Sequence, residues 1–292
     1  MKQQMKNCLV CLTLSLFGLG SQVLLATDTF APLKDGEAPQ SVEALWADYD
    51  PRAEPLDVEI LKQWEEDDVV MQVLRYRVGI FKGRKSMMAA VYGYPKGATN
   101  LPGLVQAHGG GQYADYRAVL TNAKRGYATI SIAWAGRIHA PDYKVSRDGV
   151  AIFFQQATDH PDYKVTTDWA ALDGYHAPAR DGASSMGVEA ARYTLDEVES
   201  PRNCCYFLWT LAARRALTFL EQQPQVDAER LGIYGHSMGG KITTLTAGID
   251  KRVKAAAPSG GWISNRTDNE LYQKTFAVDL FLDHLSCPIL FL

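Results

Sequence analysis

The sequence has few cysteines, no excess of basic residues and only one long uncharged run. Five of its 292 residues are cysteines, and Cys204, Cys205 and Cys287 are the three that lie outside the N-terminal run. Three thiols cannot form a disulfide framework, and their spacing matches no metal-ligand pattern. The net charge of -3, without a cluster of lysines or arginines, excludes a strongly basic nucleic-acid-binding protein. A hydrophobic core must therefore stabilise the fold.

The remaining composition is typical of a globular protein. Hydrophobic residues make up 47% of the chain and charged residues 22%, which is enough apolar surface for a sizeable core. The length allows one large domain or two small ones. Residues 27–66 are mixed and acidic and contain four prolines. We expect them to form a lead-in that lies over the main domain, which spans residues 67–292.

The uncharged run lies at the N-terminus. Lys2 and Lys6 precede residues 8–26, which carry no charge and are rich in leucine. A basic start followed by an apolar stretch is typical of a secretory signal peptide, which we predict over residues 1–26. A membrane anchor is the alternative, because the stretch is long enough for a short span. Glycines and polar residues interrupt it, so a secreted or periplasmic protein without a stable membrane anchor is favoured.

The rest of the chain alternates between short apolar runs and helical segments. The runs that predict strands are residues 69–81, 87–94, 104–107, 127–134, 231–234, 253–257 and 288–292. The predicted helices cover residues 115–125, the segment from Pro201 to about Gln222, and the segment from Gly239 to Ile249. This alternation predicts an α/β fold with a mostly parallel sheet and helices on both faces. The first two strands, joined by a polar turn at residues 81–85, should form an antiparallel hairpin at its edge.

The helix that follows Ser200 has clear boundaries. Ser200 suits its N-cap and Pro201 its first turn, while Pro224 ends it. Its apolar residues form one stripe: Cys205, Leu208, Trp209, Ala212, Ala216, Phe219 and Leu220. Arg214 and Arg215 fall off that stripe. We expect the apolar side of this helix to cover the sheet.

Residues 135–193 interrupt the alternation of strands and helices. They contain three histidines, several aromatic residues and two copies of the string Pro-Asp-Tyr-Lys-Val. A stretch of this length between a strand and a helix is commonly functional. It is a candidate lid or pocket wall, and an irregular surface loop is the alternative.

A strand–turn–helix motif carries the chemistry. Gly235-His236-Ser237-Met238-Gly239-Gly240 follows the strand at residues 231–234 and opens the helix that ends at Ile249. A strand that turns at once into a helix strains the hinge residue and projects its side chain out of the sheet. Ser237 would then be a nucleophile, and the Met238 N–H would face the oxyanion formed when it attacks a carbonyl. The alternative is a glycine-rich turn of another α/β fold, with Ser237 as a helix cap.

A second glycine motif supports this assignment. His108-Gly109-Gly110-Gly111-Gln112 comes directly after the strand at residues 104–107. Glycines at this place let a backbone N–H, from Gly110 or Gly111, face the same oxyanion. A phosphate-binding loop is the alternative, but no Lys-Ser or Lys-Thr follows. His108 is interpreted as a residue that anchors the loop.

At these two motifs the sequence resembles the α/β-hydrolase superfamily, and within it the branch of acetyl xylan esterases and dienelactone hydrolases. The resemblance covers roughly residues 67–292. It implies a serine hydrolase that cleaves carboxylic esters through an acyl-enzyme without a metal or cofactor. It also implies an acid after the strand at residues 288–292 and a histidine one strand later, so both should lie beyond Leu292 and the C-terminal part of the fold is missing. Oligopeptidase-like hydrolases share much of this pattern.

Several other residues are weaker candidates. Tyr113, Trp134, Arg137 and Trp262 follow predicted strands at the edge where α/β sheets bind ligands. Arg137 would suit a substrate carboxylate and Trp262 a sugar ring, with ordinary packing as the alternative for each.

The chain up to Leu292 offers no convincing catalytic base. His236 points away from Ser237 by the geometry of the turn, and His284 is expected at the surface. Asp268 and Glu270 are minor candidates for the acid. The leading interpretation is a carbohydrate esterase. The alternatives are a peptidase or lactone-opening hydrolase, or a non-catalytic binding protein if the chain naturally ends at residue 292.

Overall fold

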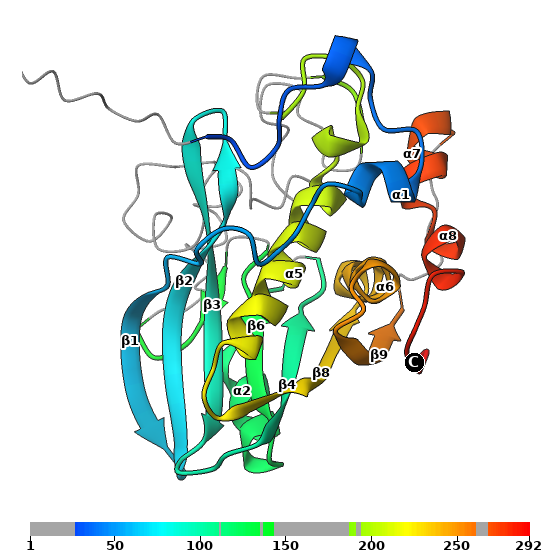
Figure 1. Cartoon of the computed structure of the whole chain (residues 1–292). Coiled ribbons are helices and arrows are strands. Elements are labelled where there is room, and N and C mark those ends of the chain that lie inside the picture. Colours follow the sequence, from blue (N-terminus) through cyan, green and yellow to red (C-terminus); the bar gives the residue numbers. More distant parts are fainter. Residues whose placement is uncertain (1–26, 111, 135–136, 143–186, 191–193, 261–267) are drawn as a thin grey trace, which may run out of the picture.

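A seven-stranded mixed sheet forms the centre of the protein, in the order β1-β2-β3-β6-β4-β8-β9 (Figure 1). The computed structural model describes residues 27–110, 112–134, 137–142, 187–190, 194–260 and 268–292. The strands of the sheet are β1 (Glu59–Glu66), β2 (Val69–Phe81), β3 (Arg84–Pro95), β4 (Leu101–Ala107), β6 (Ala128–Ile132), β8 (Val226–His236) and β9 (Val253–Ser259). A separate two-stranded sheet joins β5 (Ala114–Asp115) to β7 (Ile138–His139). The helices are η1 (Lys34–Gly36), α1 (Val42–Trp46), α2 (Tyr116–Lys124), η3 (Pro201–Asn203), α5 (Cys205–Glu221), α6 (Met238–Ile249), α7 (Glu270–Phe276) and α8 (Val278–Leu282).

The sheet divides into an antiparallel and a parallel half. β1, β2, β3 and β6 pair antiparallel in turn. β6, β4, β8 and β9 pair parallel. The predicted hairpin is confirmed as β2–β3, closed where Phe81 faces Arg84. The sheet is less parallel than the sequence suggested, because β3 joins β6 antiparallel and a further strand extends the other edge.

That further strand, β1, comes from the segment predicted as a lead-in. Its residues are mostly exposed and include Ile60, which is 56% exposed. Both faces of β1 carry charged as well as apolar residues. Its sequence therefore lacks the alternation of apolar and polar residues that predicts a half-buried strand. Residues 59–66 thus belong to the sheet, while Val42, Leu45, Trp46 and Leu56 of residues 27–58 pack against the larger core cluster.

The last residues of the chain lie beside β9. The Leu290 N–H donates to the Ala256 carbonyl at 2.9 Å, and the Leu292 N–H donates to the Pro258 carbonyl at 3.0 Å. Ala256 and Ile289 form a parallel bridge. The strand predicted at residues 288–292 therefore has its expected place, as a short extended segment that continues the parallel half of the sheet.

Helices cover both faces of the sheet (Figure 1). α2 packs on one face, where Val119, Leu120 and Ala123 join the smaller core cluster. α5 and α6 pack on the other face in the larger cluster. Among the residues that the structure describes, no helix is long and apolar enough to cross a bilayer. The predicted signal peptide at residues 1–26 lies outside the described residues.

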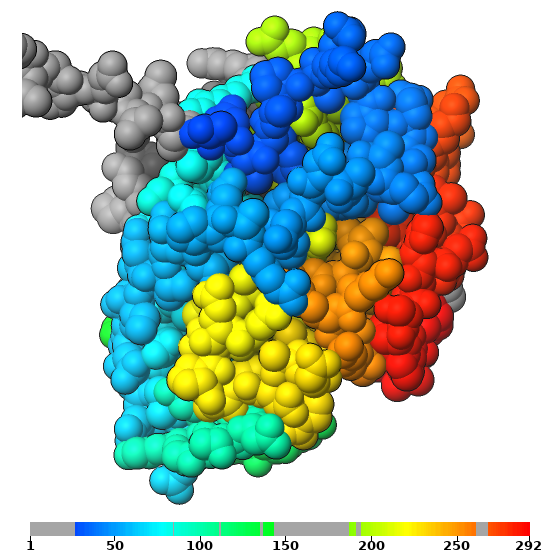
Figure 2. All heavy atoms as spheres, in the orientation of Figure 1, coloured from blue at the N-terminus to red at the C-terminus, as the bar shows by residue number. Residues whose placement is uncertain are grey.

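α5 is buried on all sides, which the sequence did not predict. Every residue from Tyr206 to Leu220 is buried, including Arg214 and Arg215. Figure 2 shows the reason, because the lead-in spreads over the side of α5 that faces away from the sheet. Arg215 is 1% exposed, and its guanidinium donates hydrogen bonds to the carbonyls of Pro51, Glu54, Pro55 and Arg77. Arg215, which lies outside the apolar stripe of the helix, thus binds the lead-in to the core.

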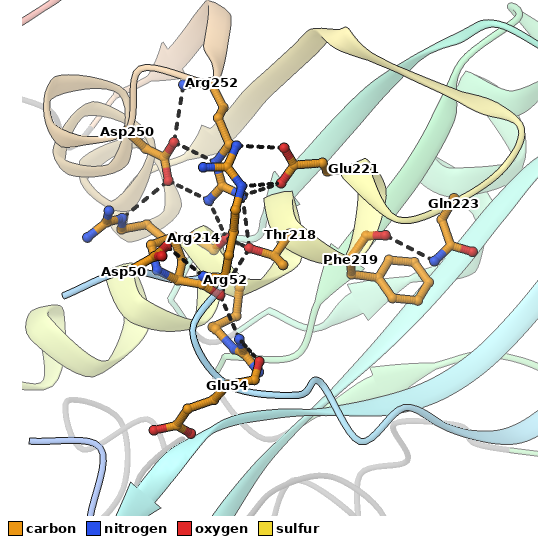
Figure 3. Close-up of polar contacts among 12 residues, drawn as sticks. Asp50, Arg52, Glu54, Arg214, Thr218, Phe219, Glu221, Gln223, Asp250 and Arg252 are labelled. Atoms are coloured by element: carbon orange, nitrogen blue, oxygen red, sulfur yellow. Dashed lines mark hydrogen bonds and ion pairs between the residues drawn. The ribbon is translucent and has the colours of Figure 1, made fainter.

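A network of charges holds the same layers together near the start of β9 (Figure 3). Arg252 donates to both carboxylate oxygens of Asp250 and to Glu221 at 3.0 Å. Arg52, in the lead-in, makes a two-pronged bond to Glu221 at 2.6 and 2.9 Å and thereby lowers the pKa of that carboxyl. Arg214 donates to Asp250 at 3.2 Å. The network joins the lead-in, the end of α5 and the α6–β9 turn.

Candidate active site

Ser237 occupies a strained turn between β8 and α6. Its backbone has φ 55° and ψ -117°, a combination that a residue with a side chain rarely adopts. Its N–H donates to the Ser259 carbonyl at 2.6 Å, which fixes the turn against β9. Ser237 occupies the N-cap position of α6, and its residue is half-buried. Its side chain makes no capping hydrogen bond to the helix, so the hydroxyl does not serve as a cap. The positive end of the α6 dipole lies directly behind the hydroxyl.

The glycines of the motif permit this turn. A Cβ on Gly235 would lie 2.4 Å from the Gly239 carbonyl oxygen, and one on Gly240 would lie 2.4 Å from the Gly260 carbonyl oxygen. Both contacts are with backbone, which cannot move aside as a flexible side chain can. A Cβ on Gly239 would likewise overlap the Ala107 and His108 carbonyls. Met238 is the first residue of α6, so its N–H has no carbonyl one turn before it within the helix.

The glycine loop lies against this turn. A Cβ on Gly109 would meet the carbonyl oxygen of His236 at 3.2 Å, so the two predicted motifs are neighbours in space. The Gln112 N–H donates to the Gly109 carbonyl, and the Gln112 side chain accepts from the Gly109 N–H, both at 3.1 Å. Gly110 lies inside this turn, and Gly111 lies outside the described residues. A serine and a tight glycine turn therefore meet at the carboxyl ends of β8 and β4.

Solved structures of known proteins share the fold that carries these two motifs. An acetyl xylan esterase from a Paenibacillus species is similar to this chain with a TM-score of 0.56 and 19% identity, over 86% of this chain and 75% of that one. Acetyl xylan esterase 1 from a Thermoanaerobacterium species is similar with a TM-score of 0.59 and 15% identity, over 88% and 78%. The protein has the α/β-hydrolase fold. The resemblance predicted from the sequence is thus confirmed.

Two further comparisons concern the sequence. Residues 214–289 match the family described as BAAT / Acyl-CoA thioester hydrolase C terminal. That match includes Ser237 and the whole of α6. No curated protein matches the chain.

Aromatic stacking anchors the glycine loop. His108 is 3% exposed, and its ring stacks on that of Trp134 with 4.8 Å between centroids. The Trp134 indole N–H donates to the His108 carbonyl at 2.8 Å, and its ring packs on Trp209 of α5. The interpretation of His108 as an anchoring residue agrees with this geometry. Trp134 is a fully buried core residue.

Arg137 and Tyr113, both proposed as substrate contacts, flank the same loop. Arg137 is 4% exposed, and its Nε donates to the Gln112 carbonyl at 2.9 Å. That contact braces the turn that holds Gly110. Tyr113 is half-buried, with its ring edge-on to His139 at 5.3 Å. Trp262, the third such candidate, lies outside the described residues.

The described histidines have partners other than Ser237. The His236 Nδ1 lies 3.1 Å from the Ser259 hydroxyl, as the geometry of the turn predicted. The His139 Nδ1 lies 3.1 Å from Asp115. His284 lies at the surface, 2.9 Å from Glu43, also as predicted. His160 and His176 belong to the part of residues 135–193 that the structure does not describe.

Within the part of the chain that the structure describes, no contact holds the acidic candidates near the turn. Glu270 is exposed and pairs with Lys274 at 2.5 Å, one helical turn away. Asp268 is exposed at the start of the same segment. Neither arrangement is that of a carboxylate orienting a buried histidine.

One buried charged residue close to Ser237 was not predicted from the sequence. Lys241 is the single charged residue between Met238 and Ile249, and it is 2% exposed. The sequence could have indicated this burial, because Lys241 stands alone in an otherwise uncharged helix. A buried charge in such a segment is usually paired with other groups.

Proposed function

We propose that this protein is an exported serine hydrolase that cleaves carboxylic esters through an acyl-enzyme. The observation that carries the proposal is the strained conformation of Ser237 at the N-terminus of α6. In it the hydroxyl is neither buried nor used as a cap. Strain of this kind persists only where the surrounding structure imposes it, and it is common at catalytic residues.

The chemistry follows from the parts around Ser237. Its Oγ attacks the ester carbonyl carbon, and the carbonyl oxygen gains negative charge. The Met238 N–H and an N–H from Gly110 or Gly111 stabilise that charge. The alcohol leaves with a proton from a histidine, and water then hydrolyses the acyl-enzyme with the same histidine as base.

We place the histidine and the acid beyond Leu292, as the resemblance implies. The position of residues 288–292 beside β9 is consistent with an acid that follows them at the carboxyl edge of the sheet. An unassisted serine hydroxyl is a poor nucleophile, so turnover depends on these two groups. The coding sequence downstream of codon 292 tests the placement. An in-frame Asp followed by a His supports it, whereas a stop codon favours a non-catalytic binding protein.

The proposed substrate is an ester of a carbohydrate, such as an acetylated polysaccharide. Acetyl xylan esterases are among the structures with this fold, and export would bring the enzyme to such substrates. A second candidate is a thioester, because residues 214–289 match a family of acyl-CoA thioester hydrolases. Both reactions use the same nucleophile and oxyanion site. They differ in the leaving group.

Labelling with a fluorophosphonate tests the nucleophile. In the full-length protein, the peptide that contains Ser237 should be labelled, and Ser237→Ala should lose the label. Ser259→Ala is the matched control, because Ser259 carries a hydroxyl beside the same turn and should leave labelling intact. Labelling that survives Ser237→Ala would refute the assignment.

A substrate panel tests which leaving group the enzyme accepts. Acetylated xylan and p-nitrophenyl acetate report esterase activity, acetyl-CoA reports thioesterase activity, and a chromogenic peptide reports peptidase activity. We expect acetate release from the first two. Release from acetyl-CoA alone would favour the thioester candidate, and peptide cleavage alone would favour an oligopeptidase.

A further inference from the structure

Lys241 lies one helical turn after the proposed nucleophile. Its backbone N–H donates to the Ser237 carbonyl at 3.1 Å, which closes the first turn of α6. The side chain is 2% exposed. A buried lysine is costly, because the ammonium loses its hydration and must find other partners. Its position beside Ser237 therefore calls for an explanation.

Two tyrosines from different helices surround the Lys241 ammonium. Its Nζ donates to the hydroxyl of Tyr272 at 2.7 Å. The same Nζ lies 4.9 Å from the ring centroids of Tyr206 and Tyr272. Tyr206 belongs to the first turn of α5, and Tyr272 belongs to α7. One side chain thus ties the helix that carries Ser237 to two neighbouring helices.

The contacts depend on the charge of Lys241. A cation is attracted to the face of an aromatic ring, whereas a neutral amine is not. Burial lowers the pKa of Lys241 to about 8, an effect that the nearby Cys204 partly opposes. Burial also raises the pKa of the Tyr272 hydroxyl and raises that of the Cys204 thiol to about 12, so both stay protonated near neutrality. The negative charge of Glu189 also contributes to raising the pKa of the Cys204 thiol.

The cluster costs stability, which points to a role in function. An apolar side chain of similar length would fill the same space without desolvating a charge, and replacing a buried charge in this way is often neutral or stabilising. Residues that lower stability are commonly kept where they serve an active site.

We propose that Lys241 is a positioning residue for the nucleophile. Its ammonium, held by Tyr206 and Tyr272, fixes the first turn of α6 and so orients Ser237 and the Met238 N–H for attack. The inference rests on the proposed function. It adds a pH dependence, because loss of the proton from Lys241 releases both ring contacts.

The test compares variants of the full natural chain in hydrolysis of p-nitrophenyl acetate. We expect Lys241→Met to lower kcat roughly tenfold or more, with KM little changed and a thermal midpoint equal to or above that of wild type. Tyr272→Phe should lower kcat in the same direction. It serves as the second variant if Lys241→Met fails to fold. Tyr76→Phe is the matched control, since the Tyr76 hydroxyl donates to the Ala212 carbonyl in α5 and does not contact Lys241. It should keep its kcat.

The pH profile separates positioning from packing. The kcat of the wild type should fall as pH rises through about 8, where Lys241 loses its proton. Lys241→Arg keeps its charge in this range, so its kcat should not fall there. Unchanged kcat in both Lys241→Met and Tyr272→Phe would overturn the inference. A wild type that hydrolyses no ester would instead count against the proposed function.

Discussion

A Cβ on Gly239 would lie 2.0 Å from the carbonyl oxygen of Ala107. Gly239 is in the first turn of α6, and Ala107 is the last residue of β4, directly before the glycine loop. The start of α6 and the residues that lead into the loop holding Gly110 therefore lie backbone against backbone. The relative position of the two proposed oxyanion donors depends on that contact.

Gly239→Ala should be strongly destabilising. The new methyl group would overlap the carbonyls of Ala107 and His108, and backbone must shift to admit it. We expect the free energy of unfolding to fall by about 3 kcal/mol or more, in the range of severe overpacking. Urea denaturation measures the change.

Gly97→Ala is the matched control for Gly239→Ala. Gly97 has φ 71°, and no atom lies within 4 Å of its Cβ position. An alanine there should cost about 1 kcal/mol, from backbone strain alone. Equal losses at the two positions would show that the Ala107 contact is unimportant.

Arg215→Met should separate the lead-in from the core. Three of the four carbonyls that Arg215 binds belong to the lead-in and the fourth to β2, and methionine offers none of them a hydrogen bond. We expect a loss of about 3 kcal/mol in the free energy of unfolding. Arg52→Met removes a partly exposed ion pair with Glu221 and should cost at most about 1 kcal/mol. A loss at Arg215 no larger than at Arg52 would contradict this account.

Asp68→Gly should stabilise the β1–β2 hairpin. Glu66 pairs with Val69, so Asp67 and Asp68 form a two-residue turn, with φ 52° and 61°. Glycine adopts positive φ at no steric cost, and Asp-Gly is a preferred pair in such turns. We expect a gain of about 0.5 kcal/mol, read as a higher thermal midpoint. Asp68→Ala is the opposite control and should lower that midpoint.

Stability should rise with pH above 8 because of Lys241. Its pKa is about 8 in the folded protein and near the ordinary 10.5 when unfolded. Between these values the unfolded chain binds more protons, so the free energy of unfolding increases with pH. The shift corresponds to at most about 3 kcal/mol across that interval. Urea denaturation at pH 7.5 and pH 10 should show the rise in the wild type and a smaller one in Lys241→Met. If the free energy of unfolding changed equally with pH in the wild type and in Lys241→Met, the lowered pKa of Lys241 in the folded protein would be contradicted.

Local patterns predicted much of this fold. The strands at residues 69–81, 104–107 and 253–257, the helix after Ser200 and the turn at Ser237 follow from periodicity, capping residues and glycine spacing. Each of these signals acts over a few residues, so the sequence displays it directly. β1 has no such signal, since it is an exposed edge strand whose pairing with β2 depends on the two-residue turn at Asp67 and Asp68.

The sequence by itself determined the strand–turn–helix motif at Ser237, the glycine loop and the order of elements that brings them to one edge of a sheet. Only the tertiary structure decided that Arg215 and Lys241 are buried. Their burial depends on residues far away in the chain, the lead-in carbonyls for Arg215 and the rings of Tyr206 and Tyr272 for Lys241. A long charged side chain can be solvated by water or by the protein. Which of the two occurs is set by packing between elements, which local sequence does not encode.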